Sequence, residues 1–279
     1  MNHFALLHHP KIPQSEALAA EIAEWLREHE RTVWLGSVWD EQTIAERIAD
    51  FDLVIPMGGD GTTLRTARIA AHYGVPILGI NLGRVGFLAE LTPSDWRTKF
   101  PDLLAGRYWI EERMMLHAEF WRDEEPQQGF EALNDVVISR GELARIVRLP
   151  TFIDGGYLTT YIADGLIVAT ATGSTAYALA VGGPILPPEL KNILLVPIAP
   201  HLSMDRAIVL SQGAKVEVQV STGHRAILTV DGQFHVELWH GDRVFVQASE
   251  YVSRFVRLQE RMYLYQTLME RLTKHGQWV

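Results

Sequence analysis

The stretch Ile55–Leu64, IPMGGDGTTL, decides how the first part of the chain folds. An apolar run from Leu53 to Met57 leads into it, as expected for a strand buried on both faces of a sheet. Three glycines within four residues then leave bare backbone where the strand gives way to a helix. Open α/β sheets bind ligands at such strand ends, and N–H groups at a helix N-terminus suit a phosphate. The stretch therefore predicts a phosphate-binding turn.

Asp60 lies in the middle of this turn, where a lone carboxylate would repel a phosphate. Such a group is useful if it holds a metal ion or accepts a proton from an attacking hydroxyl, and both are roles in phosphoryl transfer. Taken alone, Asp60 is explained equally well as a turn residue or a helix N-cap. The turn matches neither the dinucleotide pattern G-x-G-x-x-G nor the Walker pattern.

The segments on both sides of the turn alternate between strand and helix patterns. The predicted strands are Phe4–His8, Thr32–Leu35, Leu53–Met57 and Pro76–Ile80, and the predicted helices are Ser15–Glu28, Gln42–Ile48 and Thr62–His72. Alternation of this kind predicts βαβ units and a parallel sheet. The expected fold of this part is an α/β, Rossmann-like domain.

After Tyr108 the chain changes to short segments rich in β-branched residues and separated by turn residues, which predicts a largely antiparallel β-rich domain. The predicted strands there are Leu116–Trp121, Glu131–Ser139, Ile146–Ile153, Leu166–Ala169, Asn192–Ile198, Lys215–Val220, Ala226–Val230, Phe234–Leu238 and Arg243–Gln247. A terminal helix, Glu260–Lys274, has a mostly apolar face and is expected to pack back on the α/β domain. We therefore expect an α/β domain of residues 1–108 and 256–279 and a β-rich domain of residues 109–255.

The composition excludes several classes of protein. The 279 residues are 47% apolar, and cysteine is absent, so disulfides and thiolate-bound metals are excluded. A formal net charge of −9 argues against a nucleic-acid partner. Without a signal peptide or a bilayer-length apolar run, we expect a cytoplasmic protein with no membrane partner. The eleven histidines show no metal-ligand spacing.

A second glycine-rich turn, Asn81–Leu88, follows the next predicted strand. On its own it is an ordinary loop whose glycines allow positive φ. Because neighbouring parallel strands end at the same edge of a sheet, we expect the two turns to line one cleft. Arg84 would then bring a cation near a phosphate.

The longest run of chemically specific residues is Tyr161–Tyr177. Its apolar strand lies between Asp164-Gly165 and a loop rich in Thr, Gly and Ser. The hydroxyls and glycines of this loop could bind a phosphate or a ribose. The same loop could also cap a predicted helix, Thr175–Val181. Asn134-Asp135 opens a strand and can read an adenine edge or ribose hydroxyls, although alone such a pair is usually a turn. Asp231-Gly232-Gln233 alone is a hairpin signal.

Together these motifs resemble the NAD kinase family, and their order and spacing match from about Leu53 to Asp231. The glycine turn alone is shared with phosphofructokinases and with diacylglycerol and sphingosine kinases, whereas the Thr-Gly-Ser-Thr-Ala-Tyr loop is much more specific. The resemblance implies a phosphofructokinase-like first domain, a β-rich second domain and NAD bound in a cleft between them. The matching motifs are Gly58–Thr62, Asn81–Phe87, Asn134-Asp135, Asp164-Gly165, Thr172–Tyr177 and Gly182–Pro184.

The family transfers a phosphoryl group to the 2′-hydroxyl of the adenosine ribose of NAD and makes NADP. The resemblance therefore implies a phosphotransferase with ATP or polyphosphate as donor, Mg²⁺ or another divalent metal held through the donor phosphates, and a homodimer or homotetramer. Asp60 is the implied catalytic residue, and the implied donor-phosphate residues are Gly58, Gly59, Gly61, Thr62 and Arg84. The implied NAD-binding residues are Asp60, Gly61, Asn81, Phe87, Asn134, Asp135, Asp164, Thr172, Thr175, Ala176, Tyr177, Ala180, Asp231 and Gly232.

The chain departs from the family pattern at four positions. Asp135 stands where the family usually has Glu, Ala171 where it has Pro, Ala180 where Ser is common, and Ala207 where Pro is usual. None of these residues lies in the glycine turn. The departures are therefore expected to affect how the substrate is bound more than which reaction is catalysed.

Other functions compete with this interpretation. A sugar-phosphate kinase should show clustered basic side chains, and a lipid kinase should show an apolar entrance for acyl chains. A dinucleotide-binding regulator would bind NAD without turnover, with Asp60 in a structural role. The sequence leaves open the donor, the use of NADH, feedback inhibition and the oligomeric state.

Overall fold

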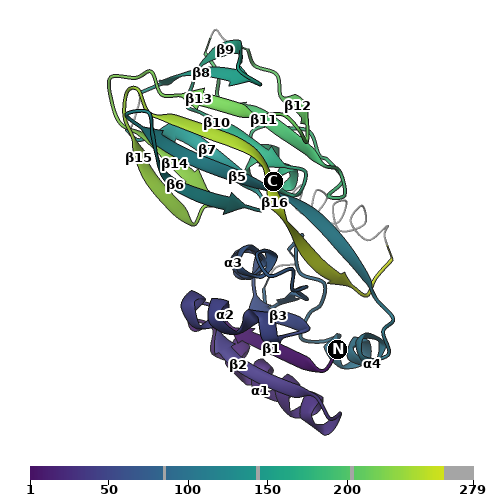
Figure 1. Ribbon diagram of the computed structural model, residues 1–279. Coiled ribbons are helices and arrows are strands. Elements are labelled where there is room, and N and C mark those ends of the chain that lie inside the picture. The colour runs from purple at the N-terminus through teal and green to yellow at the C-terminus, as the bar shows by residue number, and fades with distance from the viewer. Residues whose placement is uncertain (84–85, 143–144, 202–203, 261–279) are drawn as a thin grey trace, which may run out of the picture. The chain divides into compact units, whose positions relative to one another are not determined.

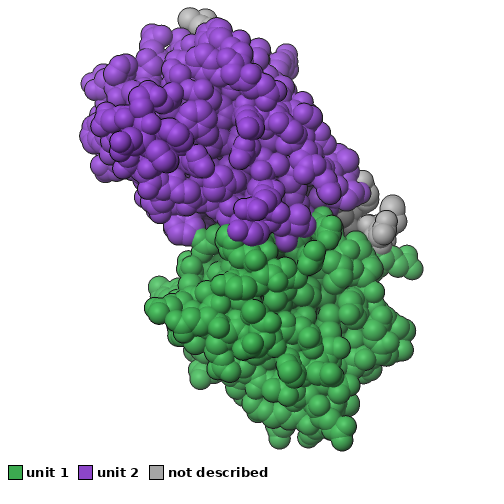
Figure 2. All heavy atoms as spheres, viewed as in Figure 1, with its two compact units in different colours: residues 1–112, 253–279 green, residues 113–252 purple. Residues whose placement is uncertain are grey.

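The structure is a computed structural model that describes residues 1–83, 86–142, 145–201 and 204–260 (Figure 1). The chain forms two compact units, one of residues 1–112 with 253–279 and one of residues 113–252 (Figure 2). The predicted terminal helix, Glu260–Lys274, lies outside the described residues apart from Glu260.

The first unit is built on a parallel sheet with the strand order β2-β1-β3-β4 (Figure 1). Its strands are β1 (His3–His8), β2 (Thr32–Ser37), β3 (Leu53–Gly58) and β4 (Ile80–Asn81). Its helices are α1 (Pro13–Glu28), α2 (Glu41–Arg47), η1 (Ile48–Asp50), α3 (Asp60–Ala71) and α4 (Trp96–Leu104). The α/β domain with a parallel sheet predicted from the alternating pattern is confirmed.

The core of this unit follows from the residue pattern. Every residue of β3 is buried, as its uninterrupted apolar run predicts for a central parallel strand. α1 buries Leu18, Ile22 and Leu26, which recur at intervals of four residues along one face. Burying each of these side chains stabilises the fold by about 1.5–3 kcal/mol. This packing fixes the end of β3, and α3 starts there.

Two parts of the first unit differ from the sequence expectation. The predicted strand Pro76–Ile80 is reduced to the two residues of β4, and Ile77 makes only isolated bridges to Val54 and Phe255. Gly79 lies in this break, where a Cβ would come within 3.0 Å of the Ala89 backbone. α4 was not predicted, since Pro101 lies inside it and obscures the helical pattern.

The second unit contains two six-stranded sheets with the orders β12-β11-β10-β7-β14-β15 and β6-β5-β16-β13-β8-β9. The first sheet contains β7 (Asp135–Arg140), β10 (Gly165–Thr170), β11 (Asn192–Ile198), β12 (Ile208–Ser211), β14 (Ala226–Val230) and β15 (Phe234–Leu238). The second contains β5 (Trp109–Arg122), β6 (Glu125–Ala132), β8 (Val147–Ile153), β9 (Gly156–Ala163), β13 (Val216–Gln219) and β16 (Arg243–Arg257). Residues 109–112 of β5 and 253–257 of β16 belong to the first unit. The pairings given by register within this unit are antiparallel, so the predicted β-rich domain is confirmed.

The two faces of the first of these sheets have different neighbours. Val136 and Ile138 of β7 belong to a large buried cluster that includes residues of both sheets. Val137 points the other way, because side chains alternate along a strand, and packs with Ala169 and with Ala178 of α5 (Tyr177–Ala180). Asp135 has the same parity as Val137 and so lies on this second face.

Several boundaries in the second unit were wrong in the sequence analysis. The segment Glu131–Ser139 forms two strands, β6 and β7, and not one. β9 and β12 were missed, while β5 and β16 are longer than expected. The predicted helix Thr175–Val181 is a 3-10 turn, η2 (Thr172–Thr175), followed by α5, because Ala176 has a non-helical backbone with φ −98° and ψ −124°.

Within the described part of the chain, none of the helices has the length and apolar character needed to traverse a bilayer.

Candidate functional site

The first glycine turn joins β3 directly to α3. Gly58 ends the strand in a tight position, because a Cβ there would lie 2.2 Å from the Oγ1 atom of Thr62. Gly59 and Gly61 are exposed, and a Cβ on either would meet no atom within 4 Å. The start of the helix therefore carries no side chain at these two positions, so a phosphate could approach its backbone closely. Thr62 itself is buried beneath the turn.

The second glycine turn lies beside the first, as predicted. β3 and β4 pair in parallel with Gly58 opposite Asn81, and the N–H of Leu82 donates to the carbonyl of Gly58 at 3.1 Å. The loops that follow the two strands therefore begin at the same edge of the sheet.

The Asp60 carboxylate connects the two turns. It accepts the backbone N–H of Phe87 at 3.0 Å and that of Leu88 at 3.4 Å. The N-cap of α3 is Gly59, so the explanation of Asp60 as a helix cap is wrong. Two backbone donors occupy only part of the lone-pair capacity of a carboxylate, so Asp60 can still accept a hydrogen bond from a ligand hydroxyl.

Gly86 is required by the position of Asp60. A Cβ at Gly86 would lie 1.6 Å from the Oδ1 atom of Asp60, so any other residue would displace that carboxylate. Asn81 is buried and shapes the same loop, because its Oδ1 atom accepts the N–H of Gly83 at 2.9 Å. Phe87 is half-buried beside it. Arg84 lies outside the described residues.

In the second unit, Asp231 organises the start of β7. Its carboxylate accepts the backbone N–H groups of Leu133, Asn134 and Asp135 at 2.9, 2.8 and 3.0 Å. Asp231 and Gly232 have φ values of 50° and 65°, which form the hairpin between β14 and β15. The hairpin prediction is confirmed, and the side chain of Asp231 also separates β6 from β7.

Asp135 carries a buried carboxyl group on the face of β7 described above. The residue is 6% exposed, and its cross-strand neighbour on β10 is Ala169. No hydrogen bond joins its side chain to the described residues. Burial, and then the nearby Asp231 carboxylate, raise the pKa of Asp135 to about 7. The group can therefore either donate or accept a hydrogen bond near neutral pH.

This carboxyl group predicts a pH-dependent stability. The pKa of Asp135 is raised from 3.8 to about 7 by folding, so the folded state holds the proton more tightly and stability falls as pH rises through this window. A tenfold change in an ionisation constant corresponds to about 1.4 kcal/mol, so the loss is of the order of 4 kcal/mol at most. The measurement is the free energy of unfolding by urea between pH 4 and pH 8. Asp135→Asn should flatten this dependence, and parallel curves for the two proteins would contradict the assignment.

The Thr/Gly/Ser loop after β10 packs closely on Asn134. A Cβ at Gly173 would lie 2.0 Å from the carbonyl oxygen of Asn134, so only glycine fits. The hydroxyl of Thr170 donates to the carbonyl of Leu133 at 2.5 Å and accepts the N–H of Gly173 at 3.0 Å. The structure therefore brings together two motifs, Asn134-Asp135 and the loop, that lie far apart in the sequence.

The hydroxyls of this loop divide into two groups. The Oγ atom of Ser174 donates to the carbonyl of Ala171 at 2.6 Å and accepts the N–H of Leu186 at 2.9 Å, so its role is structural. Thr175 donates to the carbonyl of Thr172 at 3.2 Å. The Oγ1 atom of Thr172 is buried and has no partner among the described residues. In the described part of the chain, Thr172 therefore keeps the full hydrogen-bonding capacity of its hydroxyl.

The short helix α5 presents the remaining predicted side chains. Tyr177 is 45% exposed, so its ring is open to stacking. Ala176 is half-buried and Ala180 is exposed, which leaves space beside the ring. Ala207, one of the departures from the family pattern, packs against the apolar cluster under this helix.

Asp164 has an ionic partner that the sequence analysis missed. Its Oδ2 atom lies 3.2 Å from an Nη2 atom of Arg140, and the Arg140 N–H donates to the Asp164 carbonyl at 2.9 Å. The ladder between β7 and β10 brings the two residues together, which no local pattern reveals.

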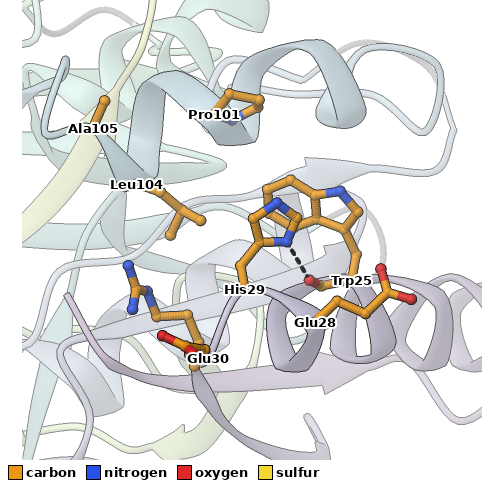
Figure 3. Close-up of a pocket in the computed structure, with 8 residues that line it drawn as sticks. Trp25, Glu28, His29, Glu30, Pro101, Leu104 and Ala105 are labelled. Carbon is orange, nitrogen blue, oxygen red and sulfur yellow. Dashed lines mark hydrogen bonds between the residues drawn. The ribbon is translucent and has the colours of Figure 1, made fainter.

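The first unit also contains a cavity of about 490 Å³. It is lined by Trp25, Glu28, His29, Glu30, Arg31, Pro101, Leu104 and Ala105 (Figure 3). The His29 ring stacks on Trp25 with 3.9 Å between centroids, and its Nδ1 atom is 2.8 Å from the Trp25 carbonyl oxygen. None of the residues singled out in the sequence lines this cavity.

Metal-binding residues are not grouped in the described ranges. No cluster of three histidine, aspartate or glutamate side chains suited to a metal ion occurs there. A divalent ion at the glycine turns would therefore need most of its ligands from a bound phosphate and water.

Comparisons with known proteins identify related chains over nearly the whole length. The ATP-NAD kinase N-terminal domain matches residues 15–108, and the ATP-NAD kinase C-terminal domain matches residues 133–258. The NAD kinase of Chloroflexus aurantiacus is 41% identical over 274 residues, covering 98% of this chain and 99% of that protein. The NAD kinase of Heliobacterium modesticaldum is 41% identical over 259 residues, covering 90% and 92%.

Solved structures give the same result. Yeast NADH kinase complexed with NADH superposes with a TM-score of 0.80 at 26% identity, over 94% of this chain and 84% of that one. An NAD kinase from Archaeoglobus fulgidus in complex with ATP superposes with a TM-score of 0.76 at 27% identity, over 94% and 95%. The two domain matches and these relatives define a kinase that acts on a dinucleotide. The chain belongs to the NAD kinase family.

Proposed function

We propose that this protein transfers the terminal phosphoryl group of ATP or polyphosphate to the 2′-hydroxyl of the adenosine ribose of NAD, which makes NADP. Family membership at 41% identity over nearly the whole chain supports the reaction. The observation that carries the proposal is Asp60, whose carboxylate stands at the bare N-terminus of α3 and is held by the backbone of the second glycine turn.

The proposed role of Asp60 is to orient the attacking hydroxyl and accept its proton. A general base of this kind contributes about 10²–10⁴-fold to the rate. Phosphoryl transfer passes through a loose transition state. The rate therefore also depends on the in-line placement of donor and acceptor and on the neutralisation of charge. Gly59 and Gly61 would let the donor phosphates approach the turn closely, because neither carries a side chain and a Cβ on either would meet no atom within 4 Å.

The dinucleotide is proposed to bind to the second unit through three groups. Tyr177 would stack on a base, since its ring is exposed. The hydroxyl of Thr172, which has no partner among the described residues, would pair with a ribose or phosphate oxygen. Asp135 would pair with a ribose hydroxyl or an amide, and its shorter side chain replaces the glutamate usual in the family.

Mg²⁺ is proposed to enter with the donor. When bound, it would neutralise negative charge on the donor phosphates. Asp60 is the carboxylate at the glycine turns that could contact the ion, although its two oxygens already accept backbone N–H groups. Removing divalent ions with EDTA should therefore abolish turnover without unfolding the chain.

The choice of donor is tested by NADP formation from NAD with Mg²⁺ and either ATP or inorganic polyphosphate. We expect activity with ATP, because a structure similar to this chain is an NAD kinase in complex with ATP. Activity with polyphosphate is expected too if the glycine backbone recognises phosphates alone. Parallel reactions with NADH as acceptor show whether the nicotinamide redox state matters. NAD binding without product from either donor would replace the kinase by a dinucleotide-binding regulator.

A homodimer or homotetramer in the cytoplasm is part of the same proposal. It rests on the family resemblance and on the exposed sheet edges of a β-rich unit. Light scattering of the purified chain gives the molar mass and decides the oligomeric state.

A further inference from the structure

Arg257, the last residue of β16, is buried between two carboxylates of the first unit. An Nη2 atom lies 2.7 Å from the Oε2 atom of Glu111 on β5, and an Nη1 atom lies 3.1 Å from the Oε2 atom of Glu90. The side chains of Arg257, Glu90 and Glu111 are 7%, 1% and 11% exposed. Three charged groups so far from water are costly unless each is held in one geometry.

The guanidinium of Arg257 also touches the loop that holds Asp60. Its Nη1 atom donates to the carbonyl of Leu88 at 3.2 Å. The N–H of the same residue, Leu88, donates to the Oδ1 atom of Asp60 at 3.4 Å, next to the stronger bond from Phe87 at 3.0 Å. Leu88 is therefore held on its carbonyl side by Arg257 and on its N–H side by Asp60.

Glu90 joins its own loop to the chain that follows β16. Its Oε1 atom accepts the N–H groups of Leu258 and Gln259 at 2.8 and 2.9 Å, and the amide of Gln259 donates to the Glu90 carbonyl at 3.1 Å. The loop after the second glycine turn and the returning chain after β16 are thus joined by both side-chain and backbone groups. Burial raises the pKa of Glu90, while Arg257 opposes that rise and favours the carboxylate.

We propose that Arg257 is a positioning residue that places the Asp60 carboxylate through the Leu88 peptide. The fork of the guanidinium bonds two carboxylates and a carbonyl at once, which a lysine cannot reproduce. If the loop shifts, the two N–H groups that orient Asp60 shift with it. This inference rests on the proposed kinase reaction.

The same two strands offer a matched control. Arg254 on β16 pairs with Glu112 on β5 at 3.3 Å and donates to the carbonyl of Gly74 at 3.0 Å. The side chains of this pair are 44% and 50% exposed. Like Arg257, Arg254 thus makes an ion pair and a hydrogen bond to a backbone carbonyl. Neither of its partners belongs to the loop that holds Asp60.

The test is a double-mutant cycle in the kinase assay, with Arg257→Lys, Asp60→Asn and the combination, and with Arg254→Lys as control. In the wild-type background, we expect Arg257→Lys to lower kcat about 10- to 100-fold, as a misplaced catalytic group does. KM for NAD should change little. In the Asp60→Asn background, the same substitution should have almost no effect on kcat, because the group that it positions is gone. Arg254→Lys should leave kcat unchanged.

An equal fold-loss in both backgrounds would overturn the proposal and show that Arg257 acts by general stability alone. An unchanged kcat for Arg257→Lys would overturn it as well. If Arg257→Lys does not fold, Glu111→Gln keeps a hydrogen-bond acceptor for Arg257 and takes its place in the cycle with the same expected outcome. A wild-type protein that makes no NADP would instead remove the proposed function, whatever Arg257 does.

Discussion

Asp60→Asn is expected to lower kcat for NADP formation about 10²–10⁴-fold, the usual contribution of a general base. The substitution keeps the size of the side chain and one oxygen for the N–H of Phe87, but its amide cannot take a proton from the 2′-hydroxyl. KM for NAD should rise far less, because the dinucleotide groups of the second unit are unchanged. Steady-state kinetics with ATP and Mg²⁺ measure both constants.

Asp52→Asn is a matched control for this variant. Asp52 precedes β3 as Asp60 follows it, and its carboxylate also accepts two backbone N–H groups, those of Asn2 and His3 at 2.5 and 3.1 Å. It lies at the amino end of the strand, away from the glycine turns. We expect Asp52→Asn to lower the unfolding midpoint slightly and to leave kcat unchanged. Near-normal turnover of Asp60→Asn would remove Asp60 from the chemistry.

Gly86→Ala is expected to be nearly as damaging, although the added methyl group carries no chemistry. Its Cβ would stand 1.6 Å from the Oδ1 atom of Asp60, so the carboxylate or the loop must move by more than an ångström. A displacement of that size in a catalytic group costs about 10²-fold. We therefore expect a large loss of kcat, a smaller effect on KM for NAD, and a lower unfolding midpoint from the lost packing.

Gly83→Ala separates this steric effect from a general sensitivity of the loop. A Cβ there would have the Oδ1 atom of Asn81 as its nearest neighbour at 3.9 Å, an ordinary contact. Gly83→Ala should therefore keep kcat near that of the wild type. Equal losses from both substitutions would mean that the loop is sensitive at every position, and that Gly86 has no particular relation to Asp60.

The α/β organisation could be predicted because its causes are local. The run Leu53–Met57 is buried on both faces, and the glycines after it permit the sharp entry into α3. The adjacency of the two glycine turns also follows from a general rule, since parallel strands that neighbour one another end at one edge. The motif order then led to the family that the comparisons show.

The parts that could not be predicted depend on contacts between distant residues. Asp231 takes the N–H groups of three residues nearly one hundred positions away and thereby divides one predicted strand into two. Arg140 pairs with Asp164, and nothing in the sequence around either residue indicates that pair. Arg257 meets Glu90 across 167 residues, and no periodicity encodes that pair. In each case a side chain meets a group that is distant in sequence, so the residues around it show no pattern that would predict the contact.

The central claim is tested most directly by incubating the wild-type chain with NAD, ATP and Mg²⁺, beside Asp60→Asn. The product is measured with an NADP-specific dehydrogenase. NADP in the wild-type reaction and little in the variant is the predicted result, and it would establish both the reaction and the role of the carboxylate. Measurable NAD binding with no NADP in the wild-type reaction would contradict the account.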